Sequence, residues 1–151
     1  AMERRLAVRF GDVMELVGCD LPEDGVQAGG TIRVTLYLRA LAPSRRLLRL
    51  GMWFESEDGR SLGTRFHASH YPVQGQYRTT EWAPGELLRD EVTLRVSPHE
   101  RSMRLRLWFN VIEDGTFQAI ESDQSTGANH SVSLGEIEIV GQSPSAVSHD
   151  E

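Results

Sequence analysis

The sequence contains no lysine, and all sixteen of its basic residues are arginine. Genomic base composition explains this bias most simply, yet it makes every cation a planar guanidinium that stacks on rings or grips carboxylates and phosphates. Acidic residues outnumber the arginines, and the formal net charge is -6. Because nucleic acid and anionic lipid select cationic surfaces, we expect no nucleic-acid partner.

Cysteine and long apolar runs are also scarce. The single Cys19 cannot form a disulfide within the chain, so cysteine usage does not indicate the compartment. Its place between Gly18 and Asp20 in a predicted strand favours a small core residue over a reactive thiol. There is no run of eighteen apolar residues, and the start, AMERRLAVRF, lacks the apolar centre of a signal peptide. We therefore expect no direct membrane insertion of this chain. The opening Ala1-Met2 resembles an expression scar, which leaves a longer parent protein open.

The clearest pattern in the chain is the strict alternation of MRLRLWFNVI, residues 103–112. Its odd-numbered side chains are apolar, whereas its even-numbered ones include Arg104, Arg106 and Trp108. Successive side chains of a strand point to opposite faces, so this segment predicts a strand with one face on a core. A helix would spread the same apolar residues around its circumference.

The same alternation recurs along the chain between short turn signals, and no segment has the pattern of an amphipathic helix. The predicted strands are 6–10, 13–19, 31–40, 48–55, 61–67, 87–96, 103–112, 116–122 and 131–140. Eight or nine strands of this kind predict an all-β fold, an antiparallel β-sandwich of jelly-roll or immunoglobulin-like type. A closed barrel is the alternative. We expect one domain over residues 1–141 and a flexible polar tail over 142–151.

One long segment, residues 70–84, has no periodicity. It reads HYPVQGQYRTTEWAP and contains Tyr71, Tyr77 and Trp82. Connections of this length in a compact domain are usually functional or disordered, and the three aromatic residues argue against disorder. We expect an ordered loop that packs across one edge of the sheet.

The outward positions of three long strands combine aromatic rings with guanidinium groups. If these strands lie in one sheet and in matching register, one face carries Tyr37, Trp53, Trp108, Arg33, Arg39, Arg104 and Arg106, with Tyr71, Tyr77 and Trp82 as its rim. The apolar faces of sugar rings pack on indoles, and their hydroxyls meet polar donors and acceptors, so this set predicts a glycan or glycolipid site. Two alternatives stay open: the loop covers these aromatics as a second small core, or the face binds protein.

No arrangement of residues indicates catalysis, a metal or a cofactor. His67 and His70 have the spacing H-x-x-H, but in an extended segment they point to opposite faces and lack further ligands. A glycosidase pair needs two carboxyls that face each other across a cleft, which sequence alone cannot establish. The acidic residues weighed for such a pair are Glu81, Glu86, Asp90 and Glu91. Asp123 and Asn129 are candidate calcium ligands because they offer hard oxygen atoms, and a plain polar loop is the simpler interpretation. We predict a noncatalytic domain.

Several short motifs follow one another along the chain in an order that resembles a known family. They are FGDVMELVGCDL, AGGTIRVTLYLRAL, DGRSLG, HYPVQGQYRTTEWAPGELLRDEVTLRV and LGEIEIV. The positions concerned are Phe10, Gly11, Asp12, Gly30, Thr35, Leu36, Tyr37, Pro72, Gly75, Thr79, Thr80, Trp82, Pro84, Gly85, Glu86 and Asp90. In this order they resemble the β-sandwich domain on the C-terminal side of many bacterial polytopic membrane glycosyltransferases of the lipid-phosphate-sugar type.

This resemblance implies a noncatalytic accessory module of the cell envelope, often on the extracytoplasmic side. The chain departs from the family at Arg39, where an aromatic residue is usual, and at 99–101, where a Pro-Gly-x-Tyr lead is usual. A weaker similarity is to the sandwich domain that recognises the glycan end in ATP-driven polysaccharide exporters, which implies a cytoplasmic location instead. We therefore expect glycan recognition, with protein interaction or self-association through the same face or an edge strand as the alternative.

Overall fold

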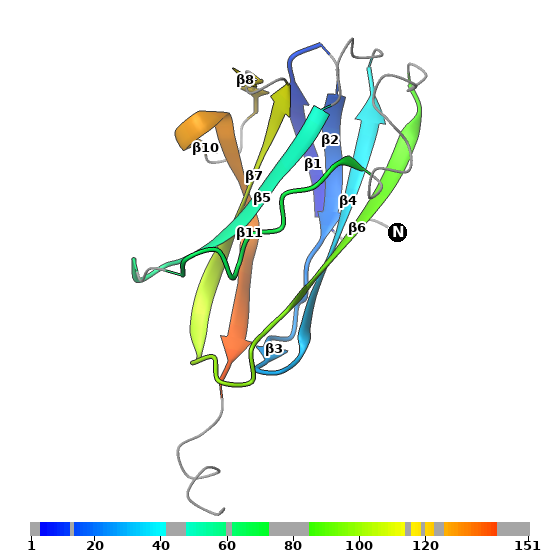
Figure 1. Ribbon diagram of the computed structural model, residues 1–151. Helices are drawn as coiled ribbons and strands as arrows, with labels where there is room; N and C mark the ends of the chain where they lie inside the picture. Colours follow the sequence, from blue (N-terminus) through cyan, green and yellow to red (C-terminus); the bar gives the residue numbers. More distant parts are fainter. Residues whose placement is uncertain are drawn as a thin grey trace, which may run out of the picture.

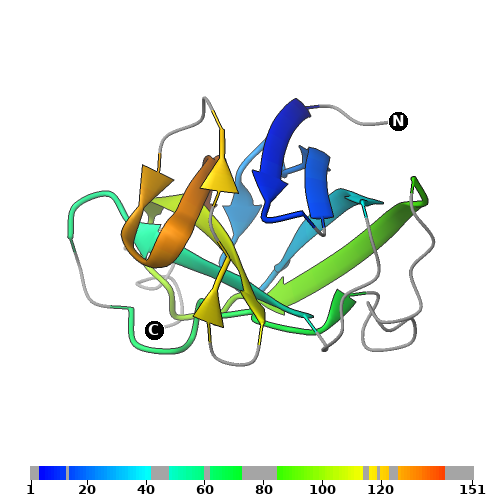
Figure 2. The same cartoon turned by 90° about the horizontal axis from the view of Figure 1, so that it is seen from above.

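The computed structural model describes residues 4–12, 14–41, 48–59, 62–72, 85–113, 116–118, 120–122 and 126–141. Within these ranges the chain forms eleven β-strands and one 3₁₀ turn at Ala128–His130. The strands build two sheets that lie face to face as two layers (Figures 1 and 2). The predicted β-sandwich is confirmed.

The first layer, here called the β4 sheet, has the strand order β6-β4-β2-β1-β9. Its members are β1 (Arg4–Phe10), β2 (Met14–Asp20), β4 (Thr31–Ala40), β6 (Leu87–Arg95) and β9 (Ile120–Glu121). All of its pairings are antiparallel. A register shift in the β2–β4 pairing falls between Leu16 and Gly18.

The second layer, here called the β7 sheet, has the strand order β10-β11-β7-β5. Its long members are β5 (Leu48–Ser56), β7 (Met103–Glu113) and β11 (Ser131–Val140). Three short strands are attached: β10 (Thr126–Gly127) and β3 (Val26–Gln27) pair with β11, and β8 (Thr116–Phe117) pairs with β7. The β3–β11 pairing is parallel.

The core lies between the layers and follows the predicted alternation. In β7 the side chains of Met103, Leu105, Leu107, Phe109 and Val111 are all buried. Phe109 meets Phe10 of the β4 sheet edge to face, with ring centroids 5.4 Å apart and an interplanar angle of 73°. Cys19 is fully buried, as predicted, and burial raises the pKa of its thiol to about 11.

Two of the predicted strands were wrong. Residues 62–66 form turns, because Gly63 takes a left-handed backbone conformation (φ +60°) and the buried Leu62 and Phe66 are four positions apart. The predicted strand 116–122 is divided between β8 and β9, which belong to different sheets. The short β3 and β10 were not predicted, since they lie in polar, glycine-containing segments.

The segment after these turns closes one side of the sandwich. It pairs irregularly with β5: the Ala68 amide donates to the Met52 carbonyl at 2.8 Å, and Leu50 exchanges backbone hydrogen bonds with His70. His70 then reaches across to β6, where its Nε2 lies 2.5 Å from Oδ2 of the fully buried Asp90. The pair therefore joins the β5 side of one sheet to the edge strand of the other.

Both ring nitrogens of His70 face acceptors, since Nδ1 lies 2.7 Å from the carbonyl oxygen of Ala68. Burial lowers the pKa of His70, but the hydrogen bond and charge of Asp90, together with the Ala68 carbonyl, outweigh it and raise the pKa above its ordinary value. The imidazolium is thus the form that this pocket stabilises.

Candidate functional site

The two tryptophans of the predicted site lie side by side on the outer face of the β7 sheet. Trp53 of β5 and Trp108 of β7 are direct cross-strand partners, and both are half-buried. Gly127 of β10 lies over the Trp108 ring, because a Cβ at this glycine would come within 2.8 Å of Cζ3. We call Trp53 and Trp108 the tryptophan pair.

The assumption that all three aromatic strands share one sheet is wrong. Tyr37, Arg33 and Arg39 belong to β4, which lies in the other layer, so their outward side chains face away from the tryptophan pair. Side-chain alternation tells inward from outward but does not assign a strand to a layer. Only Trp53, Trp108, Arg104 and Arg106 of the seven predicted face residues are brought together.

Tyr37 is closed off on its own face. Its side chain is only 8% exposed, and its hydroxyl donates a 2.6 Å hydrogen bond to Oδ2 of Asp20. This hydrogen bond is the main reason that the pKa of Tyr37 is raised, with burial and the Asp20 charge adding to it and Arg89 opposing it. The phenol ring therefore serves the scaffold and offers no open stacking surface.

The β4 sheet also borders a hollow, of about 600 Å³, which includes Arg33 in its wall. Its other charged lining residues are Asp20, Glu23 and Asp24. The remainder of its described wall is aliphatic, polar or glycine, and contains no aromatic ring. A sugar ring would find hydrogen-bond partners in this hollow but no aromatic platform.

Two hollows of about 460 Å³ each flank the tryptophan pair. The first is lined by Trp53, Phe54, Glu55, Ser56, Gly59, Leu62, Gly63 and His67. The second is lined by Glu55, Ser56, Glu57, Arg106 and Trp108. Each lies within the size range of small-molecule sites, and each places an indole beside at least one carboxylate and a hydroxyl. Glu55 and Ser56 border both hollows.

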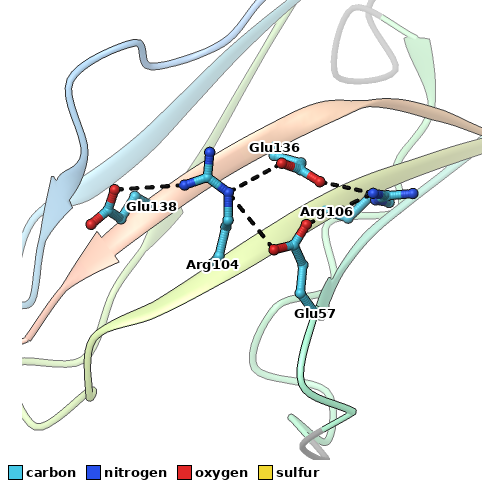
Figure 3. A network of polar contacts seen from close by, with 5 residues as sticks. All are labelled: Glu57, Arg104, Arg106, Glu136 and Glu138. Carbon is cyan, nitrogen blue, oxygen red and sulfur yellow. Dashed lines mark hydrogen bonds and ion pairs between the residues drawn. The ribbon is translucent and has the colours of Figure 1, made fainter.

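Arg104 and Arg106 are neutralised by glutamates from the neighbouring strands (Figure 3). Glu136 of β11 accepts from both arginines, at 3.1 Å from Nε of Arg104 and 2.8 Å from Nη2 of Arg106. Glu57, just beyond β5, lies 3.7 Å from each guanidinium, and Glu138 lies 3.8 Å from Arg104. We call these five residues the glutamate–arginine network.

The two carboxyls at the centre of this network influence each other. The pKa of Glu136 is lowered to about 2, first by a hydrogen bond from Glu57 and then by those from Arg106 and Arg104. The pKa of Glu57 is raised, chiefly by that same hydrogen bond to Glu136. The position of Glu136 between two guanidinium groups makes it the carboxylate that stays charged.

The predicted rim is described only in part. Tyr71 is 47% exposed, whereas Tyr77 and Trp82 lie outside the described residues, as do most of the loop 70–84 and the tail 142–151. Leu87 at the start of β6 is the other strongly exposed large apolar side chain among the described residues, at 51%.

The histidines and carboxylates considered for other chemistry are kept apart. His67 faces outward beside Trp53, while His70 faces the core, which confirms that the two point to opposite sides. On β6, Asp90 is fully buried and its neighbour Glu91 is exposed and paired with Arg89 at 2.9 Å. These two carboxyls therefore do not face each other across a cleft. Glu81 and Asp123 lie outside the described residues.

No three or more His, Cys, Asp or Glu side chains in the described ranges are grouped so that they could hold a metal ion. Within the same ranges, no helix has the length and apolar character needed to cross a membrane.

Two features of the site were not predicted from the sequence: the glutamates of the glutamate–arginine network and the contact between Gly51 and Asn110 beside the tryptophan pair. Glu136 and Glu138 occupy one parity of SVSLGEIEIV, and cross-strand charge pairing with Arg104 and Arg106 was the signal that would have found them. Next to the pair, Asn110 lies over Gly51. Its Nδ2 donates to the Asn129 carbonyl at 3.2 Å, while its buried Oδ1 has no hydrogen-bond partner among the residues that the structure describes.

Comparison with known proteins identifies the fold. No family model matches the sequence, and no curated protein sequence matches it. Among solved structures, the chain is similar to the crystal structure of the C-terminal domain of wzt, with a TM-score of 0.59 and 8% sequence identity. The similarity covers 94% of this chain and 82% of that one. At this identity the likeness concerns the fold alone, and the chain therefore shares the β-sandwich fold of that domain.

Proposed function

We propose that this domain is a noncatalytic module that recognises a glycan or glycolipid of the cell envelope through the tryptophan pair. The observation that carries the proposal is the position of two half-buried indoles, adjacent across the β5–β7 ladder and flanked by two hollows. The hollows place carboxylates and a hydroxyl beside the indoles, and the oxygens of these groups accept hydrogen bonds from sugar hydroxyls.

Two comparisons support an accessory role. The motifs of the chain resemble the sandwich domain attached to membrane glycosyltransferases and, more weakly, that of ATP-driven polysaccharide exporters. The structure with a similar fold is, by its name, the C-terminal domain of a protein, wzt. Both likenesses favour a module that serves an attached or associated partner.

A titration with bacterial cell-surface oligosaccharides, followed by tryptophan fluorescence and calorimetry, tests the proposal. We expect saturable binding to at least one oligosaccharide, and we expect Trp53→Ala to weaken it by about tenfold or more because the stacking surface is lost. Trp53→Phe keeps an aromatic ring and should retain part of the affinity. His67→Ala changes the lining of the same hollow at an exposed position. A loss of affinity in this variant could not be attributed to misfolding caused by the loss of Trp53.

Arg95→Ser is the matched control, because Arg95 is exposed on the other sheet. It should bind as the unaltered protein does. A flat response across a broad panel, or full affinity in Trp53→Ala, would contradict the proposal.

Self-association is the second candidate, favoured by the exposed Leu87 on β6, which is the edge strand of the β4 sheet. Edge strands pair readily with another chain unless they are protected. Sedimentation over a range of concentrations should then show a dimer that Leu87→Ser weakens. A monomer at every concentration would exclude this use of the edge.

A further inference from the structure

The charges around the tryptophan pair are arranged in rows across three strands. One step along the ladder from the pair, Glu55 faces Arg106, which faces Glu136; one step further, Arg104 faces Glu138, with Glu57 close by. Each arginine of the middle strand therefore has a glutamate on either side. Four glutamates surround two arginines, so the described residues of these rows carry an excess of negative charge beside the hollows.

The two arginines are already paired with glutamates. Glu136 holds both guanidinium groups at hydrogen-bonding distance, with Glu57 at 3.7 Å from each. A carboxylate or phosphate on a ligand would have to displace Glu136, whose pKa of about 2 reflects how well its charge is stabilised there. Arg49, on the same face of β5, lies beyond Gly51 on the far side of Trp53 from Glu55.

The hollows themselves offer mostly acceptors. Glu55 borders both, Glu57 borders the second, and Ser56 supplies a small polar group whose hydroxyl already donates to Asp58. Ionised carboxylates accept hydrogen bonds and cannot donate them, so they match the hydroxyl donors of a sugar. A ligand carboxylate would instead meet like charge, which is unfavourable at short range.

From these three observations we infer that the tryptophan pair selects uncharged glycans and discriminates against acidic ones. The inference rests on the proposed function and narrows it to a class of ligand. It also reverses the expectation from composition, in which the abundant arginines suited carboxylates or phosphates. The guanidinium groups near the pair are engaged with glutamates of the adjacent strands, and the glutamates determine which ligand charge is tolerated.

The test compares neutral bacterial oligosaccharides with the same oligosaccharides after their primary hydroxyls have been oxidised to carboxylates. Ring shape and linkage stay constant while one charge per sugar is added. We expect the oxidised form of each bound oligosaccharide to bind about tenfold more weakly at low ionic strength, with the gap narrowing in salt. The double variant Glu57→Gln/Glu136→Gln should narrow the gap several-fold, because it removes the two negative charges that contact both guanidinium groups.

Glu91→Gln is the matched control, since Glu91 is an exposed, arginine-paired glutamate on the other sheet. It should leave the preference unchanged. If acidic forms bind as well as neutral ones or better, the inference is overturned while the glycan proposal stands. If neither form of any oligosaccharide binds, both are overturned.

Discussion

The two outer faces of the sandwich follow the same rule of alternation but present different surfaces. The face of the β7 sheet has the tryptophan pair, two hollows and a glutamate–arginine network with more acid than base. On the face of the β4 sheet the arginines outnumber the carboxylates, and its tyrosine is closed by Asp20. Its outward charges are Arg5, Arg9, Arg33, Arg39, Arg89, Arg95, Glu15, Asp20, Glu91 and Glu121.

This difference shows that composition does not determine what a sheet face can bind. Both faces are rich in arginine. Arg104 and Arg106 beside the tryptophan pair are each flanked by glutamates on the adjacent strands. On the β4 sheet Arg9 lies between Glu15 and Glu121 in the same way, whereas Arg33 and Arg95 face threonines of the paired strand. Cross-strand neighbours decide whether a guanidinium is a free recognition group or part of the scaffold.

The largest effect is expected at His70, because its pair with Asp90 joins the two sheets. His70→Ala removes the imidazole that contacts the fully buried Asp90 carboxylate, and breaking such a pair costs about 3–5 kcal/mol of unfolding free energy. Chemical denaturation should show one unfolding transition at a lower denaturant concentration, because the two sheets lose their contact together. The double variant His70→Ala/Asp90→Ala should recover part of the loss, since no charge is then buried. Equal instability of the single and double variants would argue against an ion pair.

The same pair predicts a pH dependence. The pKa of His70 is raised in the folded protein, so its contribution is complete below the ordinary histidine value of about 6.5 and is lost as pH rises through the raised pKa. The unaltered protein should therefore lose stability from neutral to mildly alkaline pH. His70→Ala should lack this slope. A slope that survives in the variant would assign it to another group.

An intermediate effect on the free energy of unfolding is expected at Gly51, beside the tryptophan pair. A Cβ at this position would lie 1.8 Å from Oδ1 of Asn110, so Gly51→Ala must displace that side chain. Overpacking of this kind costs about 1–3 kcal/mol. The cost should be smaller when the background is Asn110→Ala, because the clashing atom is then gone. Unfolding free energies of the unaltered protein, the two single variants and the double variant measure the coupling between positions 51 and 110. If the effects of the two substitutions simply add, the contact is contradicted.

The strands of the core were predicted from the sequence because burial enforces a period of two. Residues 103–112 show this best, since every predicted inward side chain of that strand is buried. Asp90 shares the parity of Val92, Leu94 and Val96, so its inward direction was also present in the sequence. For its chemistry, Asp90 was considered from the sequence only as one carboxyl of a glycosidase pair, because His70, which contacts it, comes from an irregular segment that periodicity does not describe.

The candidate site was predicted less completely. Trp53 and Trp108 were placed correctly on an outward face, but the layer to which β4 belongs depends on long-range pairing, and so Tyr37 was assigned to the wrong face. The division of residues 116–122 between β8 and β9 has the same origin, because local alternation carries no information about when the chain crosses from one sheet to the other.

The smallest effect is expected on the face of the β4 sheet. Tyr37→Phe removes only the hydroxyl that donates to Asp20, and the ring keeps its packing. Because the pKa of Tyr37 is raised in the folded protein, this contribution is present below the ordinary tyrosine value of about 10 and is lost as pH rises through the raised pKa. We therefore expect a slightly lower melting temperature at neutral pH, a smaller loss of stability at alkaline pH than in the unaltered protein, and unchanged oligosaccharide affinity. Weakened affinity in this variant would mean that the β4 sheet takes part in recognition, and the assignment of the site to one face would have to be abandoned.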